Sequence, residues 1–266
     1  GMRPDLIFRS GSVHMAELLD EGTFTLWART SDLPYTLPSH VSMMTGVRPT
    51  RHGIEENEYR LDRYPQFPTI FEAAHEKGLT TAFVAGKSKL KVLCKPGSID
   101  HDFVEDQDDE KVAERAVRVL RDQKPNLLVV HFRGCDYAGH FHEWGSPQQL
   151  AALRDIDAGV GQILRAVEAG GMAGETAVLL TADHGGAGIT HWEDHRGSTI
   201  PWVIRGPGIR RQFDLDRLGS RTPVKTEDTF ATVVALLGLP MPQDVDGKPV
   251  MEIVDVPSTE MLRDRP

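Results

Sequence analysis

Polar and apolar residues follow two recurring patterns along the chain: short apolar runs, and longer stretches with apolar residues at helical spacing. Two of the runs, Leu127–Phe132 and Ala177–Ala182, are apolar and β-branched, as is typical of buried parallel strands. Further strands are expected at Thr80–Ala85 and Ile200–Ile204. The helical spacing predicts helices over these ranges: Met15–Glu21, Pro68–Lys77, Lys111–Gln123, Pro147–Ala169 and Glu227–Leu237.

Strands that alternate with helices in this way predict an α/β fold. We expect a single domain over residues 1–266, in which a mostly parallel sheet is sandwiched by helices. The polar stretch Glu55–Tyr64 is expected to be solvated surface.

The composition narrows the class of protein and of partner. The apolar content of 39% and the charged content of 26% are ordinary for a soluble globular protein. A net charge of −9 argues against a nucleic-acid polymer as partner, but bound metals would reverse the local sign and admit a small phosphorylated substrate. Because no apolar run is long enough to span a bilayer, no membrane partner is expected. Cys94 and Cys135 are expected to be free thiols, which favours a cytoplasmic location; the oligomeric state cannot be inferred.

Each of the two β-branched runs is followed by an aspartate and a histidine at short spacing. Asp136 and His140 follow the first run, and Asp183 and His184 follow the second. The carboxyl ends of parallel strands are where open α/β sheets place their chemistry, so these four side chains suit a site for two divalent cations, with Zn²⁺ as the first candidate and Mn²⁺ as the second. The alternative is that they are turn and cap residues.

A candidate nucleophile lies in the segment Tyr35–Gly53. Pro38 and Ser39 suit a helix start, which would leave Thr36 in the loop before a helix N-terminus. An anionic oxygen is stabilised at such a place, and a hydroxyl bound to a divalent cation loses its proton easily. The alternative is that Thr36 and Ser39 are plain capping residues.

Several other residues could contact a ligand, although a structural role is equally compatible with the sequence. Gly86–Lys89 follows a predicted strand and could contact a phosphate, but it lacks the glycine pattern of a P-loop, so a surface loop is the expected alternative. His40 and His52 are expected to be structural. Trp144 could line a pocket or pack in the core.

Taken together, these motifs resemble the alkaline phosphatase superfamily, and most of all its type I phosphodiesterase/nucleotide pyrophosphatase branch. The resemblance rests on Thr36-Leu37-Pro38-Ser39-His40 with Thr45-Gly46, on Asp136-x-x-Gly139-His140 and on Asp183-His184-Gly185. It implies an α/β fold and a two-metal site. Thr36, Asp183 and His184 would surround the metal that activates the nucleophile. Asp136, His140 and a third histidine would hold the second metal.

The resemblance leaves two candidates for that third histidine. His195 lies six residues before Pro201, a spacing similar to that of related phosphomutases, and is favoured. His191 matches a Thr-His pattern of bacterial phosphodiesterase-like sequences. Ser39 stands where nucleotide pyrophosphatases usually carry asparagine, and its hydroxyl is expected to bind substrate. A sulfatase is disfavoured because Thr36 cannot be oxidised to formylglycine.

The implied activity is metal-dependent hydrolysis of phosphoric esters, by a phosphatase or a phosphodiesterase, through a phospho-threonine. Family members usually begin with a strand that ends in a metal-binding aspartate, followed by a segment like Gly1-Met2-Arg3-Pro4-Asp5. We therefore expect that this first strand is missing, that only one ion is held tightly, and that Asp5 is a surface residue rather than a substitute ligand. The alternatives are an impaired or non-catalytic metal-binding member, a phosphonate C–P hydrolase and, less favoured for lack of a cap domain, a phosphomutase.

Overall fold

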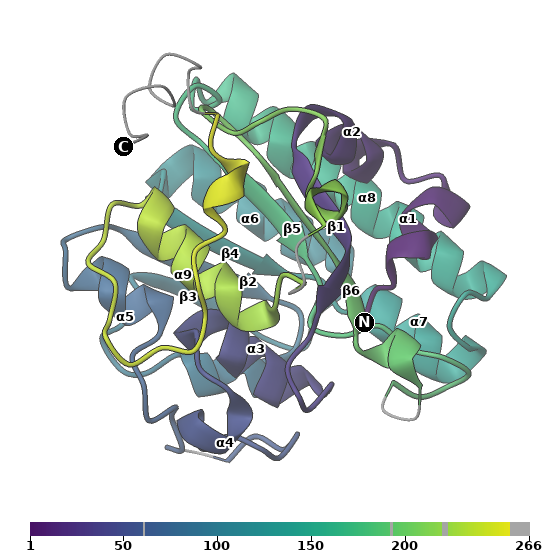
Figure 1. Cartoon of the computed structure of the whole chain (residues 1–266), viewed down its shortest axis with the longest axis horizontal. Helices are drawn as coiled ribbons and strands as arrows, with labels where there is room; N and C mark the ends of the chain where they lie inside the picture. Colours follow the sequence, from purple (N-terminus) through teal and green to yellow (C-terminus); the bar gives the residue numbers. More distant parts are fainter. Residues whose placement is uncertain (61, 192–193, 220–222, 256–266) are drawn as a thin grey trace.

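The computed structural model describes residues 1–60, 62–191, 194–219 and 223–255. Figure 1 shows the elements, which begin at the N-terminus with two short helices. The strands are β1 (Thr23–Arg29), β2 (Thr81–Ala85), β3 (His101–Val104), β4 (Leu127–His131), β5 (Val178–Thr181), β6 (Thr199–Arg205) and β7 (Phe213–Asp214). The α-helices are α1 (Pro4–Ser10), α2 (Val13–Glu21), α3 (Thr36–Thr45), α4 (Pro49–His52), α5 (Ile70–His75), α6 (Asp109–Gln123), α7 (Gly134–His142), α8 (Pro147–Ala169) and α9 (Thr226–Leu236). The 3₁₀ helices are η1 (Ser88–Leu93), η2 (His195–Gly197), η3 (Leu215–Leu218) and η4 (Met251–Ile253).

The described strands form two sheets, with the orders β3-β2-β4 and β5-β6-β1-β7. The first sheet is parallel, and β1 pairs in parallel with β7. β6 runs antiparallel to both of its neighbours, β1 and β5. Parallel pairing is thus the more common arrangement, as predicted, but β6 departs from it.

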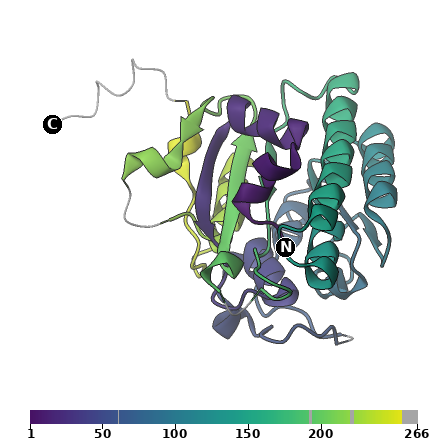
Figure 2. The same ribbon diagram turned by 90° about the vertical axis from the view of Figure 1, so that its right-hand side faces the viewer.

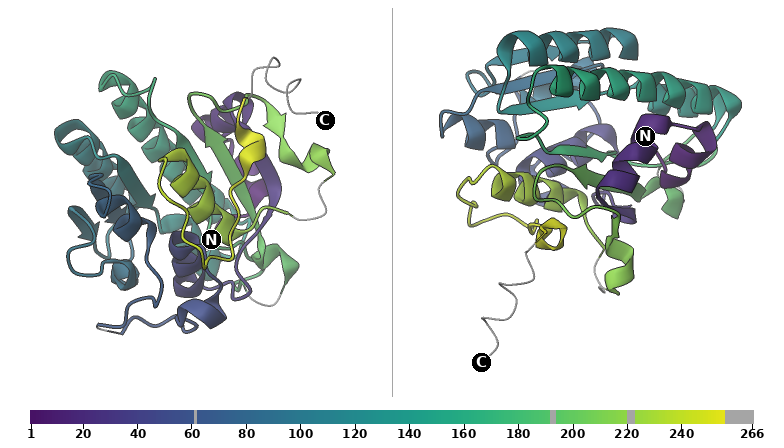
Figure 3. Two further views of the ribbon diagram at one scale, coloured as in Figure 1. Left: turned by 60° about the vertical axis from the view of Figure 1, so that its left-hand side comes forward. Right: turned by 90° about the horizontal axis from the view of Figure 1, so that it is seen from above.

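Helices cover the strands from both sides. Figure 3 shows α6 and α8 in teal on one side of the strands and α9 in yellow-green on the other. Figure 2 shows the purple α1 and α2 between β6 and α8, and contacts join both helices to α8. The predicted α/β fold, with a sheet flanked by helices, is confirmed. No helix within the described ranges is both long and apolar enough to cross a membrane.

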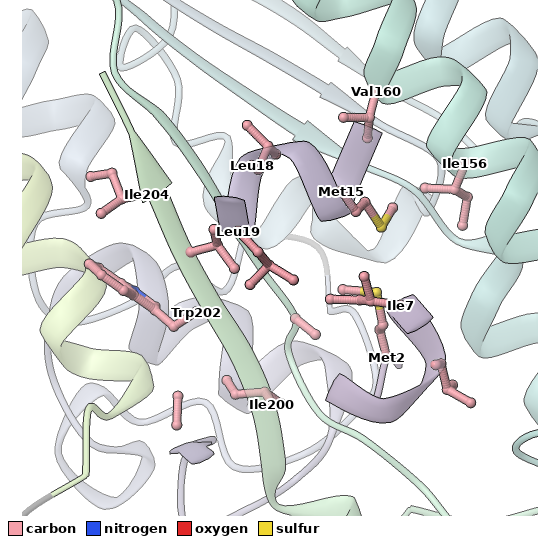
Figure 4. Packing of buried hydrophobic residues seen from close by; sticks show 14 of the residues in the cluster. Met2, Ile7, Met15, Leu18, Leu19, Ile156, Val160, Ile200, Trp202 and Ile204 are labelled. Carbon is pink, nitrogen blue, oxygen red and sulfur yellow. The ribbon is translucent and has the colours of Figure 1, made fainter. Parts of the chain in front are cut away.

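The largest core cluster lies between α1, α2, α8 and β6. Figure 4 shows Met15 and Leu18 of α2 near Ile156 and Val160 of α8, with Trp202 on the other side of β6. A second cluster lies on the other side, where α3, α5 and α9 contribute Leu37, Phe71 and Phe230. These two clusters hold both helical layers against the strands, whose ends carry the candidate site.

The predicted strands agree with the structure to within a residue or two, and α8 has the bounds that were predicted. However, β4 and β5 are half-buried along their whole length rather than buried. Each is paired with a described strand on one edge only, β4 with β2 and β5 with β6, which leaves the other edge without a strand neighbour among the described residues. The segments of α1 and β1 were not predicted as elements.

Candidate metal centre

The predicted ligands converge at the carboxyl ends of β4 and β5. Asp136 and His140 lie on α7, which follows β4, while Asp183 and His184 follow β5 directly. Ligand atoms of Asp136, His140 and His191 all lie within 4.8 Å of one another. His184 joins this group, because its Nε2 lies 3.7 Å from Oδ1 of Asp136 and 3.3 Å from Oδ2 of Asp183.

The helix α7 reaches this position by packing tightly against Trp144. A Cβ atom at Gly139 would lie 2.7 Å from the indole, so only glycine fits between Asp136 and His140 at that point of the motif. Trp144 itself is buried, which confirms a packing role.

The donor atoms fit a divalent cation. Oδ1 of Asp136 and Nε2 of His184 are buried and have no hydrogen-bond partner among the described residues, an arrangement that is costly unless an ion satisfies both. Burial lowers the pKa of His184 to about 3 and that of His191 to about 4, so both rings are neutral and able to ligate near pH 7.

Positively charged groups lie beside the carboxylates of Asp136 and Asp183. The Gly1 amine lies 2.6 Å from Oδ1 of Asp183, and Nζ of Lys87 lies 2.5 Å from Oδ2 of Asp136. Burial would raise the pKa of Asp136, but the Gly1 amine, His184 and Lys87 together hold it well below its usual range. Both carboxylates are therefore ionised, as metal ligands must be.

Thr36 is the first residue of α3 and is buried, whereas the sequence placed it in the preceding loop. In the first turn of α3, the N–H of Leu37 donates to Asn57, Pro38 has no N–H, and the N–H of Ser39 donates to the carbonyl of Tyr35.

His40, expected to be merely structural, lies beside the site. Its Nδ1–H donates to the carbonyl of Thr36 at 2.7 Å, and Nδ1 lies 3.5 Å from Oδ2 of Asp183. His52 is structural, since its ring accepts from the N–H of Ile54 and bonds Ser42.

The structure brings His191 into the cluster and leaves His195 outside it. His191 is buried and stacks on His184 with ring centroids 3.9 Å apart. The His195 side chain is 80% exposed and pairs with its neighbour Asp194. The preference for His195 is therefore not supported by the geometry.

Ser39 does not face the same space as Thr36. Its hydroxyl is fully buried and donates to the carbonyl of Asp183 at 2.6 Å, while Thr30 bonds the same carbonyl and lies 2.7 Å from the Ser39 oxygen. Ser39 thus fixes the chain at Asp183. A side-chain amide does lie beside the start of α3, but it belongs to Asn57 and not to residue 39. Its Oδ1 accepts from the N–H of Leu37.

Sequence reasoning missed Asn57, Lys87 and the position of His40. Asn57 lies in the stretch interpreted as solvated surface, and no local pattern marks it. Lys87 was expected on a surface loop, but its side chain is only 15% exposed. Asp5 is placed as expected, in α1, where it pairs with Arg3 and Arg9 and not with the cluster.

Comparisons with known proteins agree with this fold. A family model described as type I phosphodiesterase/nucleotide pyrophosphatase matches residues 1–202. The 2,3-bisphosphoglycerate-independent phosphoglycerate mutase of Synechococcus elongatus is 24% identical over 242 residues, which are 86% of this chain and 43% of that protein. The mutase of Haloarcula marismortui is 24% identical over 245 residues, again 86% of this chain and 43% of that protein. The chain thus spans less than half the length of these curated relatives.

Two solved structures show the same fold. Murine ectonucleotide pyrophosphatase/phosphodiesterase 5, solved as an inactive threonine-to-alanine variant with AMP, has a TM-score of 0.79 at 12% identity and covers 96% of this chain and 97% of its own. A 2-O GAG sulfatase has a TM-score of 0.71 at 15% identity and covers 95% of this chain and 72% of its own. Because the family model spans well over half of its length, the chain belongs to the type I phosphodiesterase/nucleotide pyrophosphatase family, within the alkaline phosphatase superfamily.

Proposed function

We propose that this protein hydrolyses small phosphoric esters, with Thr36 as the nucleophile and divalent cations held by the cluster at the ends of β4 and β5. The observation that carries the proposal is the link from the nucleophile to the ligands: His40 contacts both the Thr36 carbonyl and the Asp183 carboxylate. The murine neighbour supports threonine chemistry in this fold, because its inactive variant lacks a threonine and was solved with AMP.

Two groups of residues would hold the cations. Asp183 and His184 would hold one beside Thr36, and Asp136, His140 and His191 would hold the other, with His191 in place of His195. Zn²⁺ suits these nitrogen and carboxylate ligands, and Mn²⁺ is the second candidate. When bound, the cations would lower the pKa of the attacking hydroxyl and neutralise charge on the phosphoryl group.

The chain's own residues would then carry the reaction in two displacements. The Thr36 hydroxyl gives up its proton as its oxygen attacks phosphorus, and the bond to the ester oxygen breaks, so that the alcohol leaves with one proton and a phospho-threonine is formed. Water attacks the same phosphorus, the bond to Thr36 breaks, and phosphate is released as Thr36 regains its proton. The N–H of Leu37 is taken by Oδ1 of Asn57, so the NH2 of the Asn57 amide would be the group that stabilises the phosphoryl oxygens.

The test uses the zinc-saturated or manganese-saturated chain with a phosphomonoester and a phosphodiester of p-nitrophenol. Thr36→Ala should abolish release of p-nitrophenol and retain the ion held by Asp136. The matched control is Thr50→Ala, because Thr50 is exposed on α4. Full activity in Thr36→Ala would disprove the nucleophile assignment. No turnover by the unaltered chain with either metal would favour a non-catalytic metal-binding protein.

A second candidate is phosphoryl transfer, because the curated relatives are phosphomutases. The same phospho-threonine would then pass its phosphoryl group to an alcohol instead of water. Phosphorus NMR of a reaction that contains glycerate separates the two, since a transferase makes phosphoglycerate whereas a hydrolase makes inorganic phosphate alone. A phosphonate supplied in the same assay tests C–P hydrolysis.

A further inference from the structure

The loop after β2 turns two lysines toward the candidate metal centre. Nζ of Lys87 lies 2.5 Å from Oδ2 of Asp136, and Nζ of Lys89 donates to the backbone carbonyl of Asn57 at 3.2 Å. Ser88, between them, points to the other side, where its N–H and hydroxyl both donate to Asp106. Asp106 therefore anchors the loop from outside and leaves the two ammonium groups directed inward.

Lys89 is tied to the start of the nucleophile helix. Asn57 accepts from Lys89 with its backbone carbonyl and from the N–H of Leu37 with its side chain. Leu37 follows Thr36 directly. Lys87 thus contacts a candidate metal ligand, Asp136. Lys89 is linked by Asn57 to the residue that follows the candidate nucleophile.

Two partly buried ammonium groups at one site need negative charge. Burial lowers the pKa of Lys89, and Lys87 lowers it further, while Asp136 and Asp183 act in the opposite direction. A divalent cation at Oδ1 of Asp136, the oxygen without a hydrogen-bond partner in the described part of the chain, would offset the charge of the carboxylate whose Oδ2 contacts Lys87. In the metal-loaded protein, Lys87 and Lys89 would both lose part of the negative charge that offsets their own.

A phosphoryl group alone provides too little negative charge for this environment. Its oxygens would be shared among the cations and the Asn57 amide at the start of α3. The remaining cationic groups, Lys87 and Lys89, lie together on one loop, and charge-assisted hydrogen bonds to a second anionic group would satisfy both.

We propose that Lys87 and Lys89 form an anion subsite that binds a second acidic group of the substrate, a carboxylate or a phosphate, beside the phosphoryl group that is attacked. The preferred substrates are then small phosphoryl compounds with a further acid group two or three bonds away, rather than simple alkyl esters. The subsite contributes to catalysis only if the proposed function is correct, but its binding of an acidic group does not depend on that function.

The binding test compares three probes of similar size on the zinc-loaded full chain in a Thr36→Ala background, so that no probe is consumed. The probes are ethyl phosphate, phosphoglycolate, which adds a carboxylate, and ethylene glycol bisphosphate, which adds a phosphate. Isothermal titration calorimetry should show at least one acidic probe binding about tenfold or more tightly than ethyl phosphate. The probe that binds more tightly than ethyl phosphate identifies the preferred acid group.

Lys89→Met should remove that advantage, and Lys89→Arg, which keeps the charge, should retain most of it. The matched control is Lys91→Met, because Lys91 is on the same 3₁₀ helix but exposed. Circular dichroism confirms that each variant is folded. Equal affinity for all three probes, or an advantage that survives the double change Lys87→Met and Lys89→Met, would overturn the proposal.

Turnover by the unaltered chain separates this subsite from the proposed function. If the acidic probes bind more tightly but no ester is hydrolysed, the subsite is supported and the hydrolase is not. If esters are hydrolysed with the same kcat/KM whether or not they carry the second acid group, the hydrolase is supported and the subsite is not.

Discussion

His40 contacts Asp183 and Thr36 at the same time, with Nδ1 at 3.5 Å from the carboxylate and 2.7 Å from the carbonyl. The ring thereby fixes the first residue of α3 relative to the end of β5. We expect His40→Ala to lower kcat by about tenfold, the usual cost of losing a buried hydrogen bond, here the one to the Thr36 carbonyl, with a smaller change in KM. Steady-state kinetics on a phosphomonoester check this, and His75→Ala, at the surface, is the control.

The Ser39 hydroxyl donates to the backbone carbonyl of Asp183. A hydroxyl used in this way positions the chain rather than binding substrate. Ser39→Ala should lower the free energy of unfolding by about 1 kcal/mol, as loss of one buried hydrogen bond does. The remaining bond from Thr30 keeps the loss small. Urea denaturation measures it. A raised KM with unchanged stability would restore the substrate-binding role predicted from the sequence.

The fold could be predicted where local signals and buried faces agree. The helix α8 is an example, because Ser146 caps it, Pro147 occupies its first turn and Gly170 follows its end. By contrast, β1 was missed because Thr23 and Thr25 point inward, where an apolar residue is expected. Their hydroxyls donate to the Arg210 carbonyl and the Asp216 carboxylate, almost two hundred residues away in the sequence. No local pattern predicts such partners.

The convergence of the candidate ligands could be predicted, but not the residues around them. Asp183 and His184 come just after β5, and Asp136 and His140 lie on the helix that follows β4, so sheet geometry brings them to one edge. Lys87 and Asn57 reach the site through packing between segments that are far apart in sequence. The choice between His191 and His195 could not be made from the sequence for a related reason, since only the path of the chain between them decides which ring lies near Asp136.

Five histidines whose pKa values are lowered by burial, His40, His52, His131, His184 and His191, make the stability of the metal-free protein depend on pH. Burial lowers the pKa of His184 to about 3 and the pKa values of His52 and His191 to about 4. Between pH 6.5 and these values the unfolded chain binds protons that the folded chain does not, so stability falls as pH falls. Asp136 and Asp183, whose pKa values are lowered, act only at lower pH, near and below the ordinary value of 3.8.

His52 tests this dependence away from the ligands. In the presence of a chelator, His52→Gln should reduce the loss of unfolding free energy between pH 6.5 and pH 4.5 by about 2 kcal/mol, because glutamine cannot take up a proton. Urea denaturation at both pH values measures the difference. His142→Gln, the same change at an exposed position, is the control. The same slope in His52→Gln and the unaltered chain would contradict the prediction.

The third ligand of the Asp136 group decides how the metal centre is built. His191 lies within reach of Asp136 and His140, whereas His195 is exposed and pairs with Asp194. Elemental analysis after zinc saturation and buffer exchange should find about one tightly held ion per chain, the number expected if one site has its three protein ligands. His191→Ala should weaken this ion by about tenfold or more, measured by competition with a chelator, and Asp136→Asn should release it. His195→Ala is the matched control, a histidine four residues away that should leave the affinity unchanged. The reverse result for the two histidines would return His195 to the site and require the loop between them to fold inward when the ion binds.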